Sequence, residues 1–287
     1  MKQEKYYYKK TALIILISAV LISIFTIACV FTYIIQDRFV FFNVNDPESR
    51  EYLLNKPGYS EIKFTTDNGK IYHGMMYQQT EGIAPLIIYF GGNGECSHRF
   101  MRERDQGGIW RYYSGYNVLF TDYEGYGLND GAPHYLNMYE QSLAVFDYAS
   151  LLPNVDSSRI VTMGYSLGTG SAVYLAANRP VAGLILAAPY ANGYDIYNNI
   201  LPVFKGPLKL LVKQKLPSDK YASLVTCPVL IFASRADELI PFSSTLRLSR
   251  LFSGSAVLVE LDNVNHNGIF SVQGVHDRIQ SFLEEQL

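Results

Sequence analysis

The chain has 287 residues, of which 48% are hydrophobic and 17% are charged. This length and composition suit one compact folded domain and exclude a disordered or low-complexity protein. The formal net charge is −2, from 24 basic and 26 acidic residues, so the sequence indicates no basic surface and we expect no nucleic-acid partner.

The first predicted element is a transmembrane helix over residues 11–35, a stretch without any charged side chain. As a helix this stretch would extend about 37 Å, which is enough to cross a hydrocarbon core about 30 Å thick. Lysines are concentrated in residues 1–10, whereas only Arg38 follows the stretch closely. This bias predicts a cytoplasmic N-terminus, with the domain that follows the helix on the non-cytoplasmic side of the membrane. We expect residues 36–59 to form a linker.

Strand and helix patterns then alternate in a single domain over residues 60–287. Residues 61–66 and 70–78, joined by Asp67-Asn68-Gly69, are typical of an antiparallel hairpin. The apolar strands expected after the hairpin cover residues 85–90, 117–121, 159–163, 183–187, 228–233 and 256–261. Such alternation predicts an α/β fold with a mainly parallel sheet and helices on both faces.

Residues 164–168 read Gly-Tyr-Ser-Leu-Gly and lie between the predicted strand 159–163 and a helix of small residues over 167–178. Glycines on both sides of a serine allow a very tight strand-to-helix turn, which lifts the serine hydroxyl clear of the sheet. The pattern therefore predicts a nucleophile elbow that presents Ser166.

A serine hydroxyl needs a histidine base and an acid that orients the histidine, and in this kind of site both follow the serine in the chain. Asp237 lies in the loop after the predicted strand 228–233. His266 is the only imidazole in the polar loop 262–268, which follows the last predicted strand. We predict that Ser166, Asp237 and His266 form a catalytic triad.

Alternative residues remain for the acid and the base. Glu238 and Asp262 lie close to the same strand ends and are rival acids. His276 falls in a C-terminal helical pattern, where we expect it to be solvated rather than catalytic.

Acyl transfer also needs hydrogen-bond donors for the negative oxygen that develops on the substrate. The N–H of Leu167, directly after the serine, is the first candidate. The second is the N–H of Asn93 in the sequence Gly91-Gly92-Asn93-Gly94, which follows the predicted strand 85–90. We expect Asn93 and Leu167 to form the oxyanion hole.

Three motifs in this order resemble the α/β-hydrolase superfamily, and within it a membrane-anchored branch that contains the alpha/beta hydrolase domain-containing proteins and serine aminopeptidase-like domains. They are residues 90–94 (Phe-Gly-Gly-Asn-Gly), residues 122–127 (Asp-Tyr-Glu-Gly-Tyr-Gly) and the serine motif. The resemblance covers about residues 60–287 and implies the α/β-hydrolase fold. Two positions depart from the family pattern: Gly91 replaces a histidine and Glu124 an arginine. These departures leave open how the loop is supported.

The segment over residues 189–221 is longer than a crossover between strands requires, and the resemblance implies that it is a cap insertion. Within it, Lys205, Lys209 and Lys213 are spaced by four residues. This spacing is typical of a helix with a basic face, which either covers the core with its leucines or lies against lipid headgroups. Both interpretations remain open.

We therefore expect a single-span, membrane-anchored serine hydrolase that cleaves a carboxylic ester or thioester in a small-molecule or acylated substrate. A peptidase or amidase of the serine aminopeptidase type is the alternative, and a non-catalytic binding protein with the same fold is a further one. No cofactor and no metal site are implied. Cys96 and Cys227 show no metal-like spacing, and the sequence leaves open whether they pair.

Overall fold

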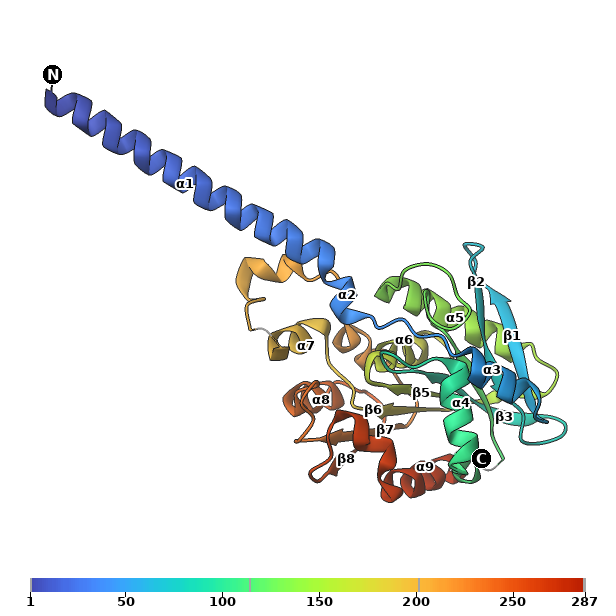
Figure 1. Cartoon of the computed structure of the whole chain (residues 1–287). Coiled ribbons are helices and arrows are strands. Elements are labelled where there is room, and N and C mark those ends of the chain that lie inside the picture. The colour runs from blue at the N-terminus through green and yellow to red at the C-terminus, as the bar shows by residue number, and fades with distance from the viewer. Residues whose placement is uncertain (1, 114, 201, 286–287) are drawn as a thin grey trace.

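The computed structural model describes residues 2–113, 115–200 and 202–285. At its centre the described chain forms an eight-stranded sheet with the strand order β1-β2-β4-β3-β5-β6-β7-β8 (Figure 1). The strands are β1 (Tyr59–Thr65), β2 (Ile71–Tyr77), β3 (Ala84–Phe90), β4 (Asn117–Thr121), β5 (Val155–Tyr165), β6 (Gly183–Ala187), β7 (Val229–Ser234) and β8 (Ala256–Leu261).

The predicted hairpin and the mainly parallel sheet are confirmed. β1 pairs with β2 and β2 with β4 in antiparallel fashion, and all pairs from β4 to β8 are parallel. Because the strands from β3 to β8 run the same way, their carboxyl ends meet at one edge of the sheet, where ligand sites of open α/β sheets lie.

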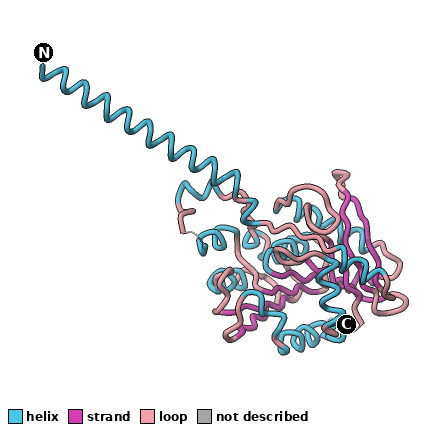
Figure 2. The backbone as a smooth tube through the Cα atoms, viewed as in Figure 1, coloured by secondary structure: helices cyan, strands magenta, loops and turns pink. Residues whose placement is uncertain are grey.

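Helices cover both faces of the sheet (Figures 1 and 2). They are α3 (Pro47–Leu54), α4 (Ser97–Gln106), α5 (Tyr135–Ser150), α6 (Thr169–Asn178), α8 (Phe242–Ser249) and α9 (Gln273–Glu285). Side chains of β3 alternate between two hydrophobic clusters, as the two-residue period of a strand requires. Ile87 belongs to the cluster that contains residues of α3, α4 and α9, and Ile88 to the one with residues of α5, α6 and α8.

β5 is longer than the expected strand over residues 159–163. Its first half carries polar side chains, among them Asp156 and Ser158, and its pairing with β3 shifts register between Ala84 and Leu86. The apolar pattern begins only where the strand becomes fully buried, at Ile160. The apolar pattern of the sequence therefore did not predict that the polar half belongs to the strand.

The N-terminal helix α1 (Lys2–Ile35) projects away from the domain as one continuous rod (Figures 1 and 2). Its residues 5–35 are long and apolar enough to cross a membrane, and the most apolar part has no buried residue. The helix is therefore not a core element of a soluble domain. It begins well before residue 11, because the lysine- and tyrosine-containing residues before the apolar stretch are also helical.

Residues 36–59, which we expected to form a linker, are folded against the domain. A short helix α2 (Asp37–Val40) follows α1 directly, and Phe41 after it is buried. In α3 the N-cap residue Asp46 accepts a hydrogen bond from Ser49 N–H, and Leu53 is fully buried. These residues are therefore part of the folded domain and not a linker.

In the segment over residues 189–221, which we expected to be a cap, the described residues form α7 (Gly193–Ile200) and the 3₁₀ helices η3 (Gly206–Leu211) and η4 (Ser218–Lys220). The expected basic α-helix over residues 205–213 is wrong, because Gly206 has a positive φ of 53° and a proline follows it. The leucines do not cover the core: no residue of η3 is buried, and Leu210 is 82% exposed. η3 instead contacts the end of α1.

Candidate active site

The turn between β5 and α6 has the geometry of a nucleophile elbow. Ser166 has a φ of 48°, a strained conformation for a residue with a side chain, and it begins the 3₁₀ turn η2 (Ser166–Gly168). A Cβ atom on Gly164 would lie 2.8 Å from Gly168 O, and one on Gly168 would lie 2.1 Å from Phe90 O. Both glycines of the motif are therefore required for the close approach of β5, η2 and β3.

The structure brings the three predicted triad residues together. His266 Nε2 lies 2.8 Å from Ser166 Oγ, and His266 Nδ1 lies 2.8 Å from Asp237 Oδ2. The side chains of His266 and Asp237 are only 4% and 3% exposed. Ser166, from the end of β5, is itself 9% exposed, so the hydrogen-bonded chain is largely shielded from water.

Asp237 is fixed by its own loop after β7. Its Oδ1 accepts hydrogen bonds from Leu239 N–H at 2.9 Å and Ile240 N–H at 2.8 Å, which leaves Oδ2 to face the imidazole. The rival acid Glu238 is exposed, and within the described chain its carboxylate accepts a hydrogen bond from the backbone N–H of His266, at 3.1 Å, and not from the imidazole. Asp262 is exposed, and in the described chain it makes no hydrogen bond to the histidine. The geometry favours Asp237 over both rivals.

His266 begins the 3₁₀ helix η6 (His266–Ser271) after β8, and Tyr165 holds it in place. The Tyr165 ring stacks on the imidazole with centroids 5.5 Å apart, and its hydroxyl donates to His266 O at 3.1 Å. Tyr165 occupies one of the two variable positions of the Gly-x-Ser-x-Gly motif. Its contact with a residue 101 positions later in the chain could therefore not be predicted from the motif.

The glycine loop after β3 runs directly beside the serine. A Cβ atom on Gly92 would lie 2.7 Å from the Tyr165 ring and 3.6 Å from Ser166 Cβ. Leu167 N–H follows the serine in the chain, and within the described residues the N–H of Asn93 has no protein acceptor. The arrangement is compatible with both amides serving as oxyanion donors, as the sequence predicts.

Glu95 supports the glycine loop by hydrogen bonds. Gly91, at the position where the family pattern has a histidine, has no side chain to do so. A Cβ atom at Gly91 would lie 2.5 Å from the Phe120 ring, so no side chain fits there. Glu95 Oε2 instead accepts hydrogen bonds from Gly92 N–H at 2.7 Å and Tyr89 O–H at 2.9 Å. Burial raises the pKa of Glu95, although its bonds to the Gly92 amide and to Tyr89 and the nearby Arg104 oppose the rise.

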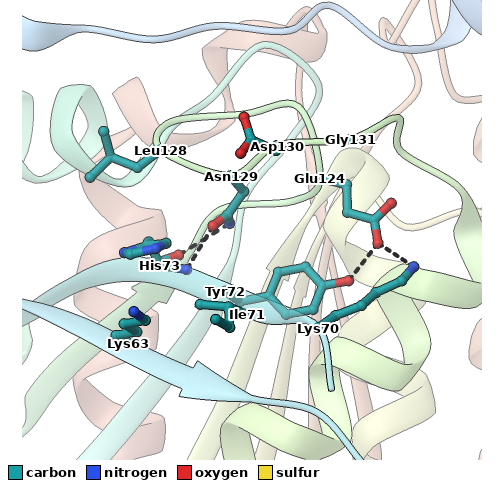
Figure 3. Close-up of a pocket in the computed structure, with 10 residues that line it drawn as sticks. All are labelled: Lys63, Lys70, Ile71, Tyr72, His73, Glu124, Leu128, Asn129, Asp130 and Gly131. Atoms are coloured by element: carbon teal, nitrogen blue, oxygen red, sulfur yellow. Dashed lines mark hydrogen bonds and ion pairs between the residues drawn. The ribbon is translucent and has the colours of Figure 1, made fainter. Parts of the chain in front are cut away.

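Glu124, the second departure from the family pattern, also has partners. Its carboxylate accepts hydrogen bonds from Lys70 Nζ at 2.6 Å, Tyr72 O–H at 2.8 Å and Asn137 Nδ2 at 3.0 Å. Lys70, Tyr72 and Glu124 border an open hollow of about 400 Å³ between β2 and the loop over residues 122–131 (Figure 3). No triad residue lines this hollow, so it is separate from the candidate active site.

Other reactive side chains are placed away from the triad. Cys29, Cys96 and Cys227 are free, so Cys96 and Cys227 do not pair in this structure. Our expectation for His276 is wrong: it is buried, stacks on Tyr112 and lies 2.8 Å from Phe270 O through Nε2. Among the described residues no cluster of histidine, cysteine or acidic side chains could hold a metal ion.

The chain is similar to proteins of the α/β-hydrolase superfamily. It is 29% identical over 232 residues to the uncharacterized protein Rv2307c of Mycobacterium tuberculosis, with 80% of each chain covered. It is 25% identical over 232 residues to alpha/beta hydrolase domain-containing protein 17C of Xenopus tropicalis, covering 79% of this chain and 70% of that protein. No family model matches the chain.

Among solved structures, the Pyrococcus furiosus esterase Pf2001 superimposes with a TM-score of 0.67 at 16% identity, covering 85% of this chain and 98% of that one. At this identity the likeness establishes the fold alone. The chain has the α/β-hydrolase fold, as its three motifs implied.

Proposed function

We propose that this chain is a serine hydrolase that cleaves a carboxylic ester or thioester through an acyl-enzyme intermediate. The observation that carries the proposal is the continuous hydrogen-bonded chain from Ser166 through His266 to Asp237, with 2.8 Å at each step. Hydrogen bonds of this length allow a proton to move from the serine to the imidazole as the serine attacks.

In the first half of the reaction, Ser166 Oγ attacks the substrate carbonyl carbon and His266 Nε2 takes the serine proton. The imidazolium that forms is stabilised by Asp237, which accepts the Nδ1 hydrogen bond. The carbonyl oxygen becomes negative and is stabilised by the N–H groups of Asn93 and Leu167. The intermediate then breaks its bond to the leaving group, which receives the proton from His266 and departs as an alcohol or thiol.

In the second half, water attacks the acyl group on Ser166. His266 takes a proton from the water, and Asp237 again holds the imidazolium. When the second tetrahedral intermediate collapses, the proton returns to Ser166 and the carboxylic acid leaves. These steps require only groups of the chain and water.

The decisive test is Ser166→Ala in the full-length protein. We expect the variant to lose all labelling by a fluorophosphonate probe, because only an activated serine attacks the phosphorus at a useful rate. Thr169→Ser, which lies in the same turn and keeps its hydroxyl, is the matched control and should be labelled. Labelling that persists in Ser166→Ala contradicts the proposal, and a wild-type protein that is never labelled favours a non-catalytic role for the fold.

The substrate class is tested by comparing acyl esters, acyl thioesters and aminoacyl amides of graded chain length. The name of the esterase that shares the fold supports the ester class. We expect esters or thioesters to be hydrolysed with the higher kcat/KM. Faster turnover of N-terminal aminoacyl amides would instead assign the protein to the peptidase alternative.

We further propose that α1 anchors the domain in a membrane, with the N-terminus in the cytoplasm. The support is the exposed apolar surface of α1 and the lysines in its first residues, which precede the apolar stretch. A protease added outside intact cells should digest the domain after residue 40. Protection until the membrane is permeabilised would reverse the orientation, and recovery of a processed soluble protein would identify α1 as a signal sequence.

A further inference from the structure

The Asn93 side chain binds the backbone of the segment that directly follows α1. Its Oδ1 accepts a hydrogen bond from Phe42 N–H at 2.8 Å, and its Nδ2 donates to Val40 O at 2.7 Å. Tyr126 O–H donates to the same Oδ1 at 2.7 Å. The amide group of Asn93 is therefore bound on both its oxygen and its nitrogen, which fixes the orientation of the side chain.

The other end of this segment is attached to the cap. Gln36 Nε2 donates to Leu211 O at 2.8 Å, and Gln36 Oε1 accepts from Lys213 N–H at 2.8 Å. Gln214 Nε2 donates to Asp37 Oδ1 at 2.8 Å, and Lys213 Nζ also binds the Asp37 carboxylate. Residues 36–44, which we call the juxtamembrane segment, thus connect the end of α1, the cap and the glycine loop.

The glycine loop has little rigidity of its own. Gly91, Gly92 and Gly94 surround Asn93, and Gly94 adopts a positive φ of 80°. Such residues lose much conformational freedom when they are ordered, so a loop of this composition needs contacts from outside. The nearby Glu95 carboxylate binds Gly92 N–H, and the backbone of the juxtamembrane segment binds the Asn93 side chain.

We infer that the juxtamembrane segment positions the oxyanion hole, so that the active site is complete only when residues 36–44 are docked. The inference rests on the proposed function, since it concerns the Asn93 N–H as an oxyanion donor. The side chain and the N–H of Asn93 share one Cα atom, so fixing the side chain restricts the direction of the N–H. Donors to an oxyanion must be oriented before the reaction, and misplacement by about 1 Å can cost about 100-fold in rate.

Phe42→Pro in the full-length, detergent-solubilised protein tests this inference, with Phe42→Ala as its matched partner. Both variants lose the exposed phenyl ring, but only proline lacks the N–H that Asn93 accepts. We expect kcat for a soluble ester to be about 10- to 100-fold lower in Phe42→Pro than in Phe42→Ala, with KM changed by less than about twofold. Asn93→Ala should lower kcat at least as much.

The affinity for an alkylboronic acid separates positioning from general destabilisation. A boronate adduct on the serine carries a negative oxygen in the oxyanion hole, whereas the bound ester does not. We expect boronate binding to weaken in Phe42→Pro by the same factor as kcat. Equal kcat in the proline and alanine variants, or a change in KM alone with unchanged boronate affinity, would overturn the inference.

Should Phe42→Pro fail to fold, Asn93→Asp and Asn93→Ala decide the question. Aspartate keeps the oxygen that accepts from Phe42 N–H and Tyr126 O–H but loses the donor to Val40 O. Activity between those of wild type and Asn93→Ala supports the inference, and wild-type activity in both variants overturns it. A failure of the proposed function gives a different result. In that case Ser166→Ala keeps the activity of the wild type, independently of the results for the variants at positions 42 and 93.

Discussion

The two halves of the candidate site are held by contacts of different range. The triad half is supported largely by local contacts: Asp237 is bound by N–H groups two and three residues away, and the Ser166 turn depends on the glycines of its own motif. In the oxyanion half, the Asn93 side chain is bound by Phe42 and Val40, which lie 51 and 53 residues earlier. A short motif can encode the first kind of support but not the second.

The largest expected effect lies in the triad half. His266→Ala should lower kcat by about 10⁴-fold or more, and Asp237→Asn by up to about 10⁴-fold, because the members of a triad act as a unit. Steady-state kinetics on a soluble ester measures both. Glu238→Gln is the control and should cost less than about tenfold, since in the described chain its carboxylate binds the His266 backbone N–H and not the imidazole. If Glu238→Gln or Asp262→Asn abolished activity while Asp237→Asn did not, the assignment of the acid would be wrong.

The next effect concerns Asp122, which connects β4 to the helix that follows the glycine loop. Its oxygens accept hydrogen bonds from Ser97 N–H and Ser97 O–H, both at 2.6 Å, and burial raises its pKa to about 6. Below pH 3.8 the carboxyl is protonated in the folded and unfolded states alike. As the pH rises toward 6, the unfolded state releases its proton first, so the folded state loses stability.

Asp122→Asn removes this titration while it keeps the shape of the side chain. We expect the free energy of unfolding of the wild type, relative to Asp122→Asn, to fall by about 2 kcal/mol as the pH rises from about 4 to about 6. Denaturant titrations of both proteins over this range measure the difference. Curves that stay parallel with pH would show that Asp122 is not held protonated in the fold.

A smaller effect is expected from Gly92→Ala in the oxyanion half. The added Cβ would lie 2.7 Å from the Tyr165 ring, so the glycine loop must move away from Ser166. We expect kcat to fall by roughly 10- to 100-fold, while the triad remains able to form. Gly274→Ala in α9 is the matched control, because a Cβ there meets nothing within 4 Å and activity should not change. Wild-type activity in Gly92→Ala would mean that the loop does not take part in the reaction.

Several features were readable from the sequence because they depend on neighbouring residues. Alternating apolar patterns located the strands that form the centre of the sheet, and the Gly-Tyr-Ser-Leu-Gly motif located the turn at Ser166. The positions of Asp237 and His266 followed from chain order and from the polar loops after two apolar strands. The strands and the serine turn are encoded within about ten residues, which is the range over which periodicity and turn chemistry act, whereas the acid and the base also required their order in the chain.

Other features were decided only when distant segments met. Residues 36–44 gave no strong periodic signal, yet the backbone groups of Val40 and Phe42 bind the Asn93 side chain. The basic spacing over residues 205–213 predicted an α-helix, but residues 206–211 form the 3₁₀ helix η3, whose Leu211 O accepts a hydrogen bond from Gln36, 175 residues earlier in the chain. The sequence by itself thus determined which groups could carry out the chemistry and where the sheet would form. The tertiary structure alone decided what holds the glycine loop. Hydrogen bonds between segments about 50 residues apart cannot be predicted from the residue pattern of either segment.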